Sequence, residues 1–252
     1  MRIIYFGNNW LGWKCLEWLA EQDEEIVGVV LHPSEKRSYG KKILDAVDLP
    51  DSHIFRANRL QEPGVTDQIQ RLEPDIGVSV LFGYILKAEL LNIFERGCVN
   101  LHPAYLPYNR GAYPNVWSLI DETPAGVTLH RIDEKIDTGD ILARRRVEKR
   151  ITDTGRSLYR RLEQASLDLF KEAWPALKVG SLTAIAQHKS EGTYHRSDDV
   201  NEIDEIDLDA TYTARELINI LRARTFPPHS GAYFKEEGRK VYVSVELSES
   251  DV

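Results

Sequence analysis

Short apolar runs alternate with segments of helical periodicity along the first part of the chain. Residues 2–6, 25–31 and 76–81 are nearly continuous apolar runs, which is typical of strands that are buried on both faces. Residues 10–20 and 65–72 instead space their apolar positions three or four apart, as one face of a helix does. Alternation of this kind predicts an α/β fold with a doubly wound, mostly parallel sheet.

The pattern changes in the last part of the chain. Apolar residues between Leu158 and Leu177 recur at helical spacing, and Gly180 ends that long helix. An acidic run, a helical run and two strand-like runs then follow at residues 198–209, 213–223, 232–234 and 241–247. We therefore expect a large domain over residues 1–188 and a small C-terminal α+β domain over residues 189–252.

One block near the middle of the chain offers reactive side chains. Asn100 and His102 follow the apolar run 97–99 and stand two apart, so on an extended strand both side chains point the same way. A second strand-like run, residues 126–132, leads to the turn Asp137-Thr138-Gly139-Asp140, which offers a carboxylate. An amide, an imidazole and a carboxylate can together stabilise an oxyanion and move a proton, as acyl transfer to an amine requires. Taken singly, these residues could equally be a strand-end cap, a satisfied histidine and a turn former.

This block resembles the formyltransferase family that uses N10-formyltetrahydrofolate. The family pattern is Asn-x-His-x-x-x-Leu-Pro, with Arg-Gly a few residues on and a later Asp-x-Gly turn. It stands in this chain as Asn100, His102, Leu106-Pro107, Arg110-Gly111 and Asp137-Thr138-Gly139. Residues 81–86 resemble the folate-binding segment of the family and residues 1–7 its first strand. Residues 224–234 resemble the C-terminal region of formyltransferases that act on nucleotide-linked amino sugars and on methionyl-tRNA.

The resemblance implies roles for three groups of residues. Asn100 and His102 would donate hydrogen bonds to the oxyanion, and Asp137 would orient His102 and help to pass a proton. The co-substrate would be N10-formyltetrahydrofolate, bound by Leu81, Phe82, Gly83, Tyr84, Ile85, Leu86, Ile132, Asp133 and Ile136. The acceptor substrate would contact Asn8, Asn9, Trp10, Arg110 and Tyr113. No metal ion is expected.

Two of the acceptor segments keep an alternative interpretation. The Asn8–Asn9 turn follows a strand and precedes a helix, so its main-chain amides could hold a phosphate, or it could be a plain turn. Its spacing is neither that of the dinucleotide motif nor that of a P-loop. Arg110 could bind a phosphate or order its own loop.

Composition and charge limit the partners. The 252 residues carry a formal net charge of −8, and the pI is about 5.5. Such a field disfavours loose binding to nucleic acid or to an anionic membrane. Together with this charge, the resemblance favours the amine of a nucleoside-diphosphate amino-deoxy sugar as the acceptor. A dTDP-linked sugar is the first choice, and the expected context is lipopolysaccharide or O-antigen synthesis. Methionyl-tRNA is the alternative acceptor, and a non-catalytic sugar-nucleotide binding protein is the alternative class.

Compartment and assembly follow from smaller signals. Cys15 and Cys98 stand in apolar segments and are expected to be buried, reduced thiols. No signal peptide is visible and no apolar stretch is long enough to span a bilayer, so we expect a cytoplasmic protein. The two C-terminal strand-like runs would make a hairpin, which is marginal alone in water, so a homodimer is expected.

Overall fold

The computed structural model describes residues 1–188 and 191–250 of the chain and shows two compact units. The first unit contains Met1–His102, Thr128–Arg144 and Ser166–Gln187. The second contains Pro103–Val127, Arg145–Ala165 and the described residues from His188 onward. The chain therefore crosses between the units several times, and the last crossing follows Gln187. A division into domains over residues 1–188 and 189–252 stays a prediction.

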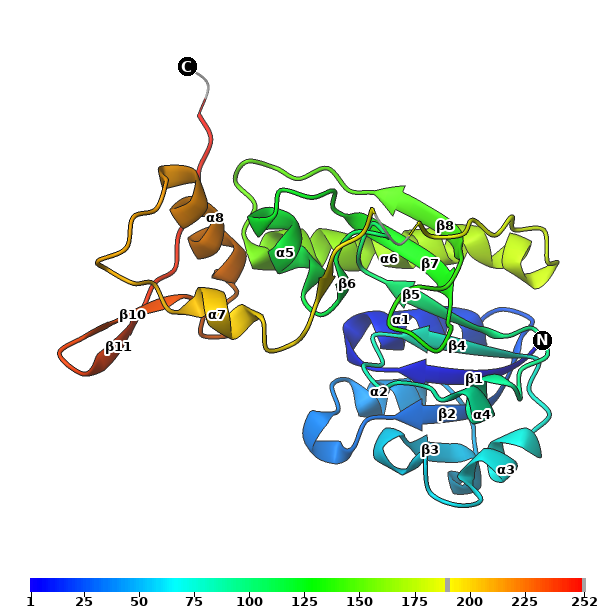
Figure 1. The fold of residues 1–252 in the computed structure, drawn as a ribbon. Helices are drawn as coiled ribbons and strands as arrows, with labels where there is room; N and C mark the ends of the chain where they lie inside the picture. Colours follow the sequence, from blue (N-terminus) through cyan, green and yellow to red (C-terminus); the bar gives the residue numbers. More distant parts are fainter. Residues whose placement is uncertain (189–190, 251–252) are drawn as a thin grey trace. The chain divides into compact units, whose positions relative to one another are not determined.

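A seven-stranded sheet dominates the first unit (Figure 1). Its strands lie in the order β3-β2-β1-β4-β5-β7-β8. The strands from β3 to β5 pair in parallel, and β7 pairs antiparallel with β5. Because β1 lies between β2 and β4, the sheet extends in both directions from β1, which confirms the predicted doubly wound, mostly parallel arrangement. The strands are β1 Arg2–Gly7, β2 Glu25–Leu31, β3 Ile54–Arg56, β4 Ile76–Val80, β5 Cys98–His102, β7 Gly126–Arg131 and β8 Ile141–Arg146.

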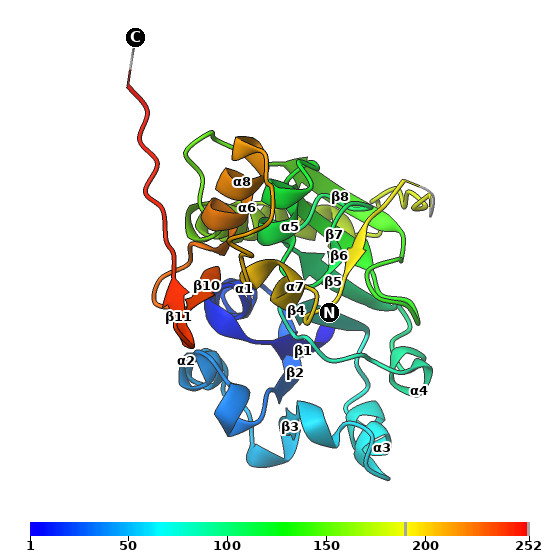
Figure 2. The same cartoon turned by 60° about the vertical axis from the view of Figure 1, so that its left-hand side comes forward.

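Helices cover both faces of this sheet. Ile3 and Tyr5 of β1 pack in one core with α1 and with the part of α6 that belongs to this unit. Ile4 and Phe6 point to the opposite face and pack with α3 and α4. The helices can be followed in Figures 1 and 2. They are α1 Asn9–Ala20, α2 Gly40–Asp45, α3 Val65–Gln70, α4 Ala88–Leu91 and α6 Gly155–Lys178, with 3₁₀ turns η1 Ser34–Lys36, η2 Asp51–His53 and η3 Ala57–Arg59.

The second unit is built from shorter elements. Helix α8 contacts α5 and begins with a reciprocal cap between Thr213 and Glu216. The Lys149 ammonium donates to the carbonyl oxygens of Ser118, at 2.6 Å, and Thr123, at 2.9 Å, near the end of α5. Strand β6 pairs in parallel with β9, and β10 pairs antiparallel with β11. The elements are α5 Pro114–Ile120, α7 Val200–Asp204, α8 Ala214–Arg224, β6 Arg110–Gly111, β9 Tyr194–His195, β10 Tyr233–Glu236 and β11 Arg239–Tyr242.

Some predicted boundaries are wrong. The strand predicted over residues 76–81 ends at Val80, because Leu81 leaves the extended region with a φ of 50°. The C-terminal strands predicted over 232–234 and 241–247 are β10 and β11. Their ends are fixed by a turn in which Glu237 and Gly238 have φ of 48° and 74°, and this turn closes the hairpin.

Two smaller expectations can be checked as well. Cys15 and Cys98 are buried free thiols, as predicted, and burial raises the pKa of both, which makes them poor nucleophiles. Within residues 1–188 and 191–250, none of the helices has the length and apolar character that a membrane span requires.

Candidate active site

The side chains of Asn100 and His102 are positioned by β5. This strand lies between the parallel strand β4 and the antiparallel strand β7, and its alternate residues face the same side of the sheet. The register with β7 places Asn100 opposite His130 and His102 opposite Thr128. Asn100 is half-buried and His102 is buried, so water screens neither polar head fully.

The Asp137 turn is held in one conformation by its neighbours. Asp137 has a φ of 53°, which is unusual for a residue other than glycine. The Gln187 amide nitrogen donates to the carbonyl oxygens of Asp137, at 3.0 Å, and Gly139, at 2.7 Å. A Cβ at Gly139 would lie 2.0 Å from the carbonyl oxygen of Arg131, so only glycine fits there.

Asp137 lies beside the amide of Asn100 and beside two imidazoles. Its Oδ1 atom accepts a hydrogen bond from Asn100 Nδ2 at 3.3 Å and lies 3.4 Å from His130 Nε2. Its Oδ2 atom lies 3.5 Å from His102 Nε2, which is an ion-pair distance rather than a good hydrogen bond. The structure therefore brings the three predicted catalytic side chains together within the first unit.

His130 is the residue of this group for which no role was predicted from the sequence. It is buried on β7, and its Nε2 atom lies 3.2 Å from Asn100 Nδ2. Its position opposite Asn100 becomes visible only when the pairing of β5 with β7 is known. In the sequence His130 is visible only as a histidine seven residues before Asp137. That spacing does not say which residues of β5 the histidine lies beside.

Such a group suits chemistry at a carbonyl carbon. The amide and an imidazole can donate hydrogen bonds to an oxygen that becomes negative in the transition state. The fixed carboxylate can orient an imidazole and stabilise a proton in transit. Within the described residues no cluster of three or more His, Cys, Asp or Glu side chains is placed to hold a metal ion.

The segment predicted to bind folate leaves β4 with strained geometry. Leu81 and Gly83 have φ of 50° and 67°. Phe82 and Leu86 are buried in the core on the α3 and α4 face, whereas Ile85 is 65% exposed. The two buried side chains anchor the segment, and Gly83 and Ile85 between them are exposed.

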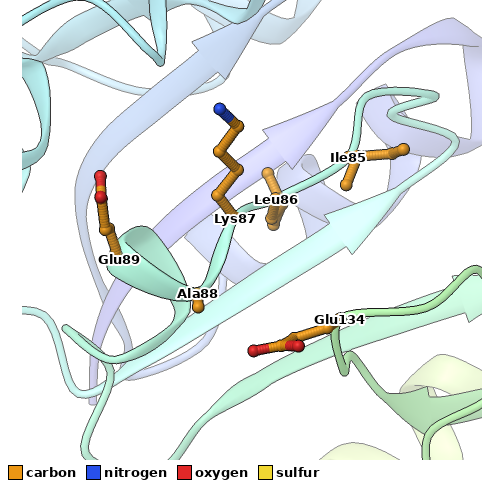
Figure 3. Close-up of a pocket in the computed structure, with 6 residues that line it drawn as sticks. All are labelled: Ile85, Leu86, Lys87, Ala88, Glu89 and Glu134. Carbon is orange, nitrogen blue, oxygen red and sulfur yellow. The ribbon is translucent and has the colours of Figure 1, made fainter.

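A cavity lies along this segment. Its volume is about 330 Å³, and Figure 3 shows its lining residues, Ile85, Leu86, Lys87, Ala88, Glu89 and Glu134. Glu134 faces the others from the segment that follows β7. Of the predicted folate contacts on that segment, Ile132 is half-buried against the core, while Asp133 and Ile136 are exposed. The Asp133 carboxylate accepts hydrogen bonds from Thr138 Oγ1 at 2.7 and 2.8 Å.

The side chain and the main-chain amide of Asn8 are hydrogen-bonded within the protein. Its Oδ1 atom accepts from the amide of Ser38 at 2.8 Å, and its Nδ2 atom lies 3.1 Å from His32 Nδ1. The main-chain amides of Asn8 and Asn9 donate to the carbonyl oxygens of Val80, at 3.3 Å, and Ser38, at 3.2 Å. Both amides are therefore already hydrogen-bonded within the protein, and a contact of Asn8 with an acceptor stays a prediction. Asn9 and Trp10 are half-buried and stay predicted contacts.

Arg110 and Tyr113 belong to the second unit. The amide of Arg110 donates to the carbonyl oxygen of Thr193 at 3.0 Å, and its Nε does so at 3.4 Å, so this guanidinium helps to order its own loop. Tyr113 is 46% exposed with a φ of 53°. Their contact with an acceptor stays a prediction.

The fold and the site define an enzyme-like α/β protein with a group built for carbonyl chemistry. Residues 1–173 match the family model described as formyl transferase, and the chain belongs to this family. Residues 199–249 match the model described as N-formyltransferase dimerization C-terminal domain.

Relatives of two kinds resemble the chain. It is 31% identical over 245 residues to the methionyl-tRNA formyltransferase of Geobacter metallireducens, which covers 95% of this chain and 77% of that protein. A 4-N formyltransferase structure from Francisella tularensis is 29% identical, covers 99% of this chain and 98% of that one, and has a TM-score of 0.82. The formyltransferase PseJ from Anoxybacillus kamchatkensis is 29% identical with a TM-score of 0.57, covering 80% of this chain and 89% of that one. That structure holds UDP-4,6-dideoxy-4-formamido-L-AltNAc and tetrahydrofolate.

His32 ties the Asn8 turn to the predicted folate segment. Its Nε2 atom donates to the carbonyl oxygen of Phe82, and its Nδ1 atom accepts from Asn8. Burial lowers the pKa of His32 below its usual 6.5, the nearby charges of Lys36 and Arg37 lower it further, and the bonds to backbone oxygens oppose the shift. The neutral ring is therefore the form that this arrangement requires.

We predict that the His32 ring titrates below pH 6.5 in the folded protein. Because the folded pKa is depressed, its contribution to stability is complete above the unfolded pKa and is lost as the pH falls through the folded pKa. NMR titration of the histidine rings, with His32→Phe for assignment, gives the midpoint. Urea unfolding of both proteins from pH 7 to pH 5 should show the pH dependence weakened in the variant. A midpoint at or above 6.5 would contradict the prediction.

Proposed function

We propose that the protein transfers the formyl group of N10-formyltetrahydrofolate to the amine of a nucleotide-linked amino-deoxy sugar. The observation that carries the chemistry is the group formed by Asn100, His102 and Asp137. Membership of the formyl transferase family supports formyl as the group that is transferred. The tetrahydrofolate in the 29% identical Anoxybacillus structure supports folate as its carrier.

The reaction can be written on these side chains. The neutral amine attacks the formyl carbon, a new C–N bond forms, and the carbonyl oxygen becomes an oxyanion. An N–H of Asn100 and an N–H of His102 donate to this oxygen. The intermediate collapses as the bond from carbon to N10 breaks. The proton that the amine loses passes to N10, with Asp137 orienting the imidazole that assists it.

The cavity beside Ile85 and Leu86 supports the placement of the folate. Its walls are apolar at Ile85, Leu86 and Ala88, which suits the flat ring of a pterin, and the exposed Gly83 leaves the adjoining main chain open to a ligand. Of the charged groups in the lining, the Lys87 ammonium suits the anionic glutamate tail of a folate, whereas the Glu89 and Glu134 carboxylates would repel it (Figure 3).

Net charge supports a sugar nucleotide over tRNA as the acceptor. A tRNA presents many phosphates and selects for a basic surface, whereas this chain has a net charge of −8. A sugar nucleotide carries about two charges, which one or two cations such as Arg110 can neutralise. The Anoxybacillus structure, which is 29% identical, supports this acceptor class because it holds a sugar nucleotide with a formamido group.

We predict that Asn100→Ala, His102→Ala and Asp137→Asn each lower kcat by about a hundredfold or more, because each removes a contact made in the transition state. Single-turnover formyl transfer gives the rates, and circular dichroism with thermal melting shows whether each variant stays folded. Asp133→Asn on the adjoining segment is a matched carboxylate control, and its effect should be mainly on the KM for folate. Near-normal turnover in two of the three variants would remove the catalytic assignment.

The acceptor can be identified with a panel of amino sugars linked to dTDP, UDP or GDP, each incubated with N10-formyltetrahydrofolate. We expect the mass of at least one sugar nucleotide to increase by one formyl group, with dTDP-linked sugars the first choice. The rate should depend only mildly on salt, because few phosphates are neutralised. Methionyl-tRNA forms a parallel arm. Formylated methionyl-tRNA with a steep salt dependence, and no product from the panel, would instead establish the alternative acceptor.

We further propose a homodimer formed through the C-terminal region. Val241 and Tyr242 of β11 are 42% and 53% exposed, and an isolated hairpin is marginal in water. The family model that matches residues 199–249 is described as a dimerization domain. Sedimentation at micromolar concentration should show a dimer, and Val241→Lys should shift it toward the monomer. A monomeric wild-type protein would contradict this proposal.

A further inference from the structure

His130 lies behind the predicted oxyanion donor. Its side chain is only 2% exposed, and the register of β5 with β7 fixes it opposite Asn100. It contacts both Asn100 and Asp137, and its ring centroid lies 6.3 Å from that of His102 at a steep angle of 88°. A buried histidine of this kind can serve for packing alone. Its hydrogen bonds show whether it also positions its neighbours.

The hydrogen bonds fix which nitrogen of His130 carries the proton. Its Nδ1 atom lies 2.7 Å from the carbonyl oxygen of Arg131. A carbonyl oxygen can only accept, so Nδ1 must donate and must carry a hydrogen. In the neutral ring the other nitrogen, Nε2, then has a lone pair and can only accept.

The same reasoning fixes the orientation of the Asn100 amide. Its nearest partners are the Asp137 carboxylate oxygen and the His130 Nε2 atom, and both are acceptors when the ring is neutral. The amide nitrogen must therefore face them, and the amide oxygen must face away. If only one of these acceptors were present, the carboxamide of Asn100 would lose one contact, and its preference for this orientation would be weaker.

Distances show how the two N–H groups of Asn100 are used. The Asn100 nitrogen lies 3.2 Å from His130 Nε2 and 3.3 Å from Asp137 Oδ1, and these two acceptors are 3.4 Å apart. The triangle is nearly equilateral, so the acceptors subtend about 60° at the nitrogen. The two N–H bonds of an amide diverge by about 120° and cannot both point at this pair. An N–H on the bisector of this pair points about 30° from each acceptor, so one N–H can serve both acceptors and leave the second for another partner.

We propose that neutral His130 is a positioning residue that acts through Asn100. It accepts one N–H of the amide, together with Asp137, and so directs the other N–H toward the formyl oxygen. Protonation at Nε2 would turn this acceptor into a donor and oppose the arrangement. The proposal rests on the proposed function for its effect on rate, but not for the protonation state of the ring.

The protonation state can be tested without any substrate. In protein labelled with ¹⁵N at histidine, two-dimensional NMR at pH 7.5 distinguishes a nitrogen that carries hydrogen from one that does not. His130→Gln assigns the signals. We expect Nδ1 of His130 to carry the hydrogen and Nε2 to lack it. A hydrogen on Nε2 at this pH would overturn the proposal, whatever the activity of the protein.

The effect on rate separates positioning from packing. Gln can place an oxygen near the position of Nε2, whereas Asn reaches only as far as Nδ1 and Phe offers no acceptor. We expect His130→Phe and His130→Asn to lower kcat by about tenfold to a hundredfold with both KM values little changed, and His130→Gln to recover most of the rate. Equal losses in Gln and Asn variants of equal thermal stability would point to packing alone and overturn the proposal.

A double-mutant cycle tests the route of action. If His130 acts through Asn100, adding His130→Asn to Asn100→Ala should change the remaining rate by less than about twofold. Multiplicative losses would show that His130 acts independently of Asn100, and that result would overturn the proposal. The rate assays require a wild-type protein that transfers formyl groups. If the wild type lacks this activity, the proposed function is contradicted, and the NMR test still decides the protonation state of His130.

Discussion

The antiparallel pairing of β7 with β5 is the constraint on which the candidate site depends. This register places His130 of β7 beside Asn100, just as the parallel strand β4 places Ser79 on its other side. Here β7 ends near the beginning of β5, where the amide of Ile132 donates to the carbonyl oxygen of Cys98 at 2.8 Å. The chain must then return along the sheet before Asp137 can reach Asn100. Gln187 supports that return by bonding to the carbonyl oxygens of the turn.

Much of the fold followed from the sequence because the signals were local. The continuous apolar run of residues 2–6 requires burial on both faces, and the structure shows β1 between two cores. The proximity of Asn100, His102 and Asp137 was predictable because Asn100 and His102 share a strand and the Asp137 turn carries its own sequence pattern. His130 was not, because its role depends on which residue of β5 it faces, and strand register is a long-range property. The hydrogen bonds of Asn8 could not be predicted for the same reason, since its partners His32, Lys36 and Ser38 lie more than twenty positions away.

Some of the predicted site residues have strained backbone. Asn9, Leu81 and Asp137 have φ of 63°, 50° and 53°. They lie in the segments that follow β1, β4 and β7 of the same sheet. Such conformations cost about 1–3 kcal/mol each and persist only where the surroundings enforce them. Such contacts are present at each position. The amide of Asn9 donates to the carbonyl oxygen of Ser38, and the side chain of Phe82, directly after Leu81, is buried. The Gln187 amide donates to the carbonyl oxygen of Asp137. The strain turns backbone and side chains out of the sheet toward the edge where ligands bind in open α/β folds.

The proton balance of the proposed reaction explains why a group of fixed polar side chains suffices. The attacking amine gives up one proton and the leaving N10 atom gains one, so the protein ends the reaction in the protonation state in which it began. What the site must supply is stabilisation of the oxygen charge while both C–N bonds are partly formed. A half-buried amide can do this only if its N–H has a defined direction, because a freely rotating carboxamide presents its oxygen as readily as its nitrogen. The carboxylate of Asp137 and the acceptor nitrogen of His130 remove that ambiguity together, at 3.3 and 3.2 Å from Asn100. The same carboxylate lies 3.5 Å from His102, so one anion orients both proposed donors to the oxyanion.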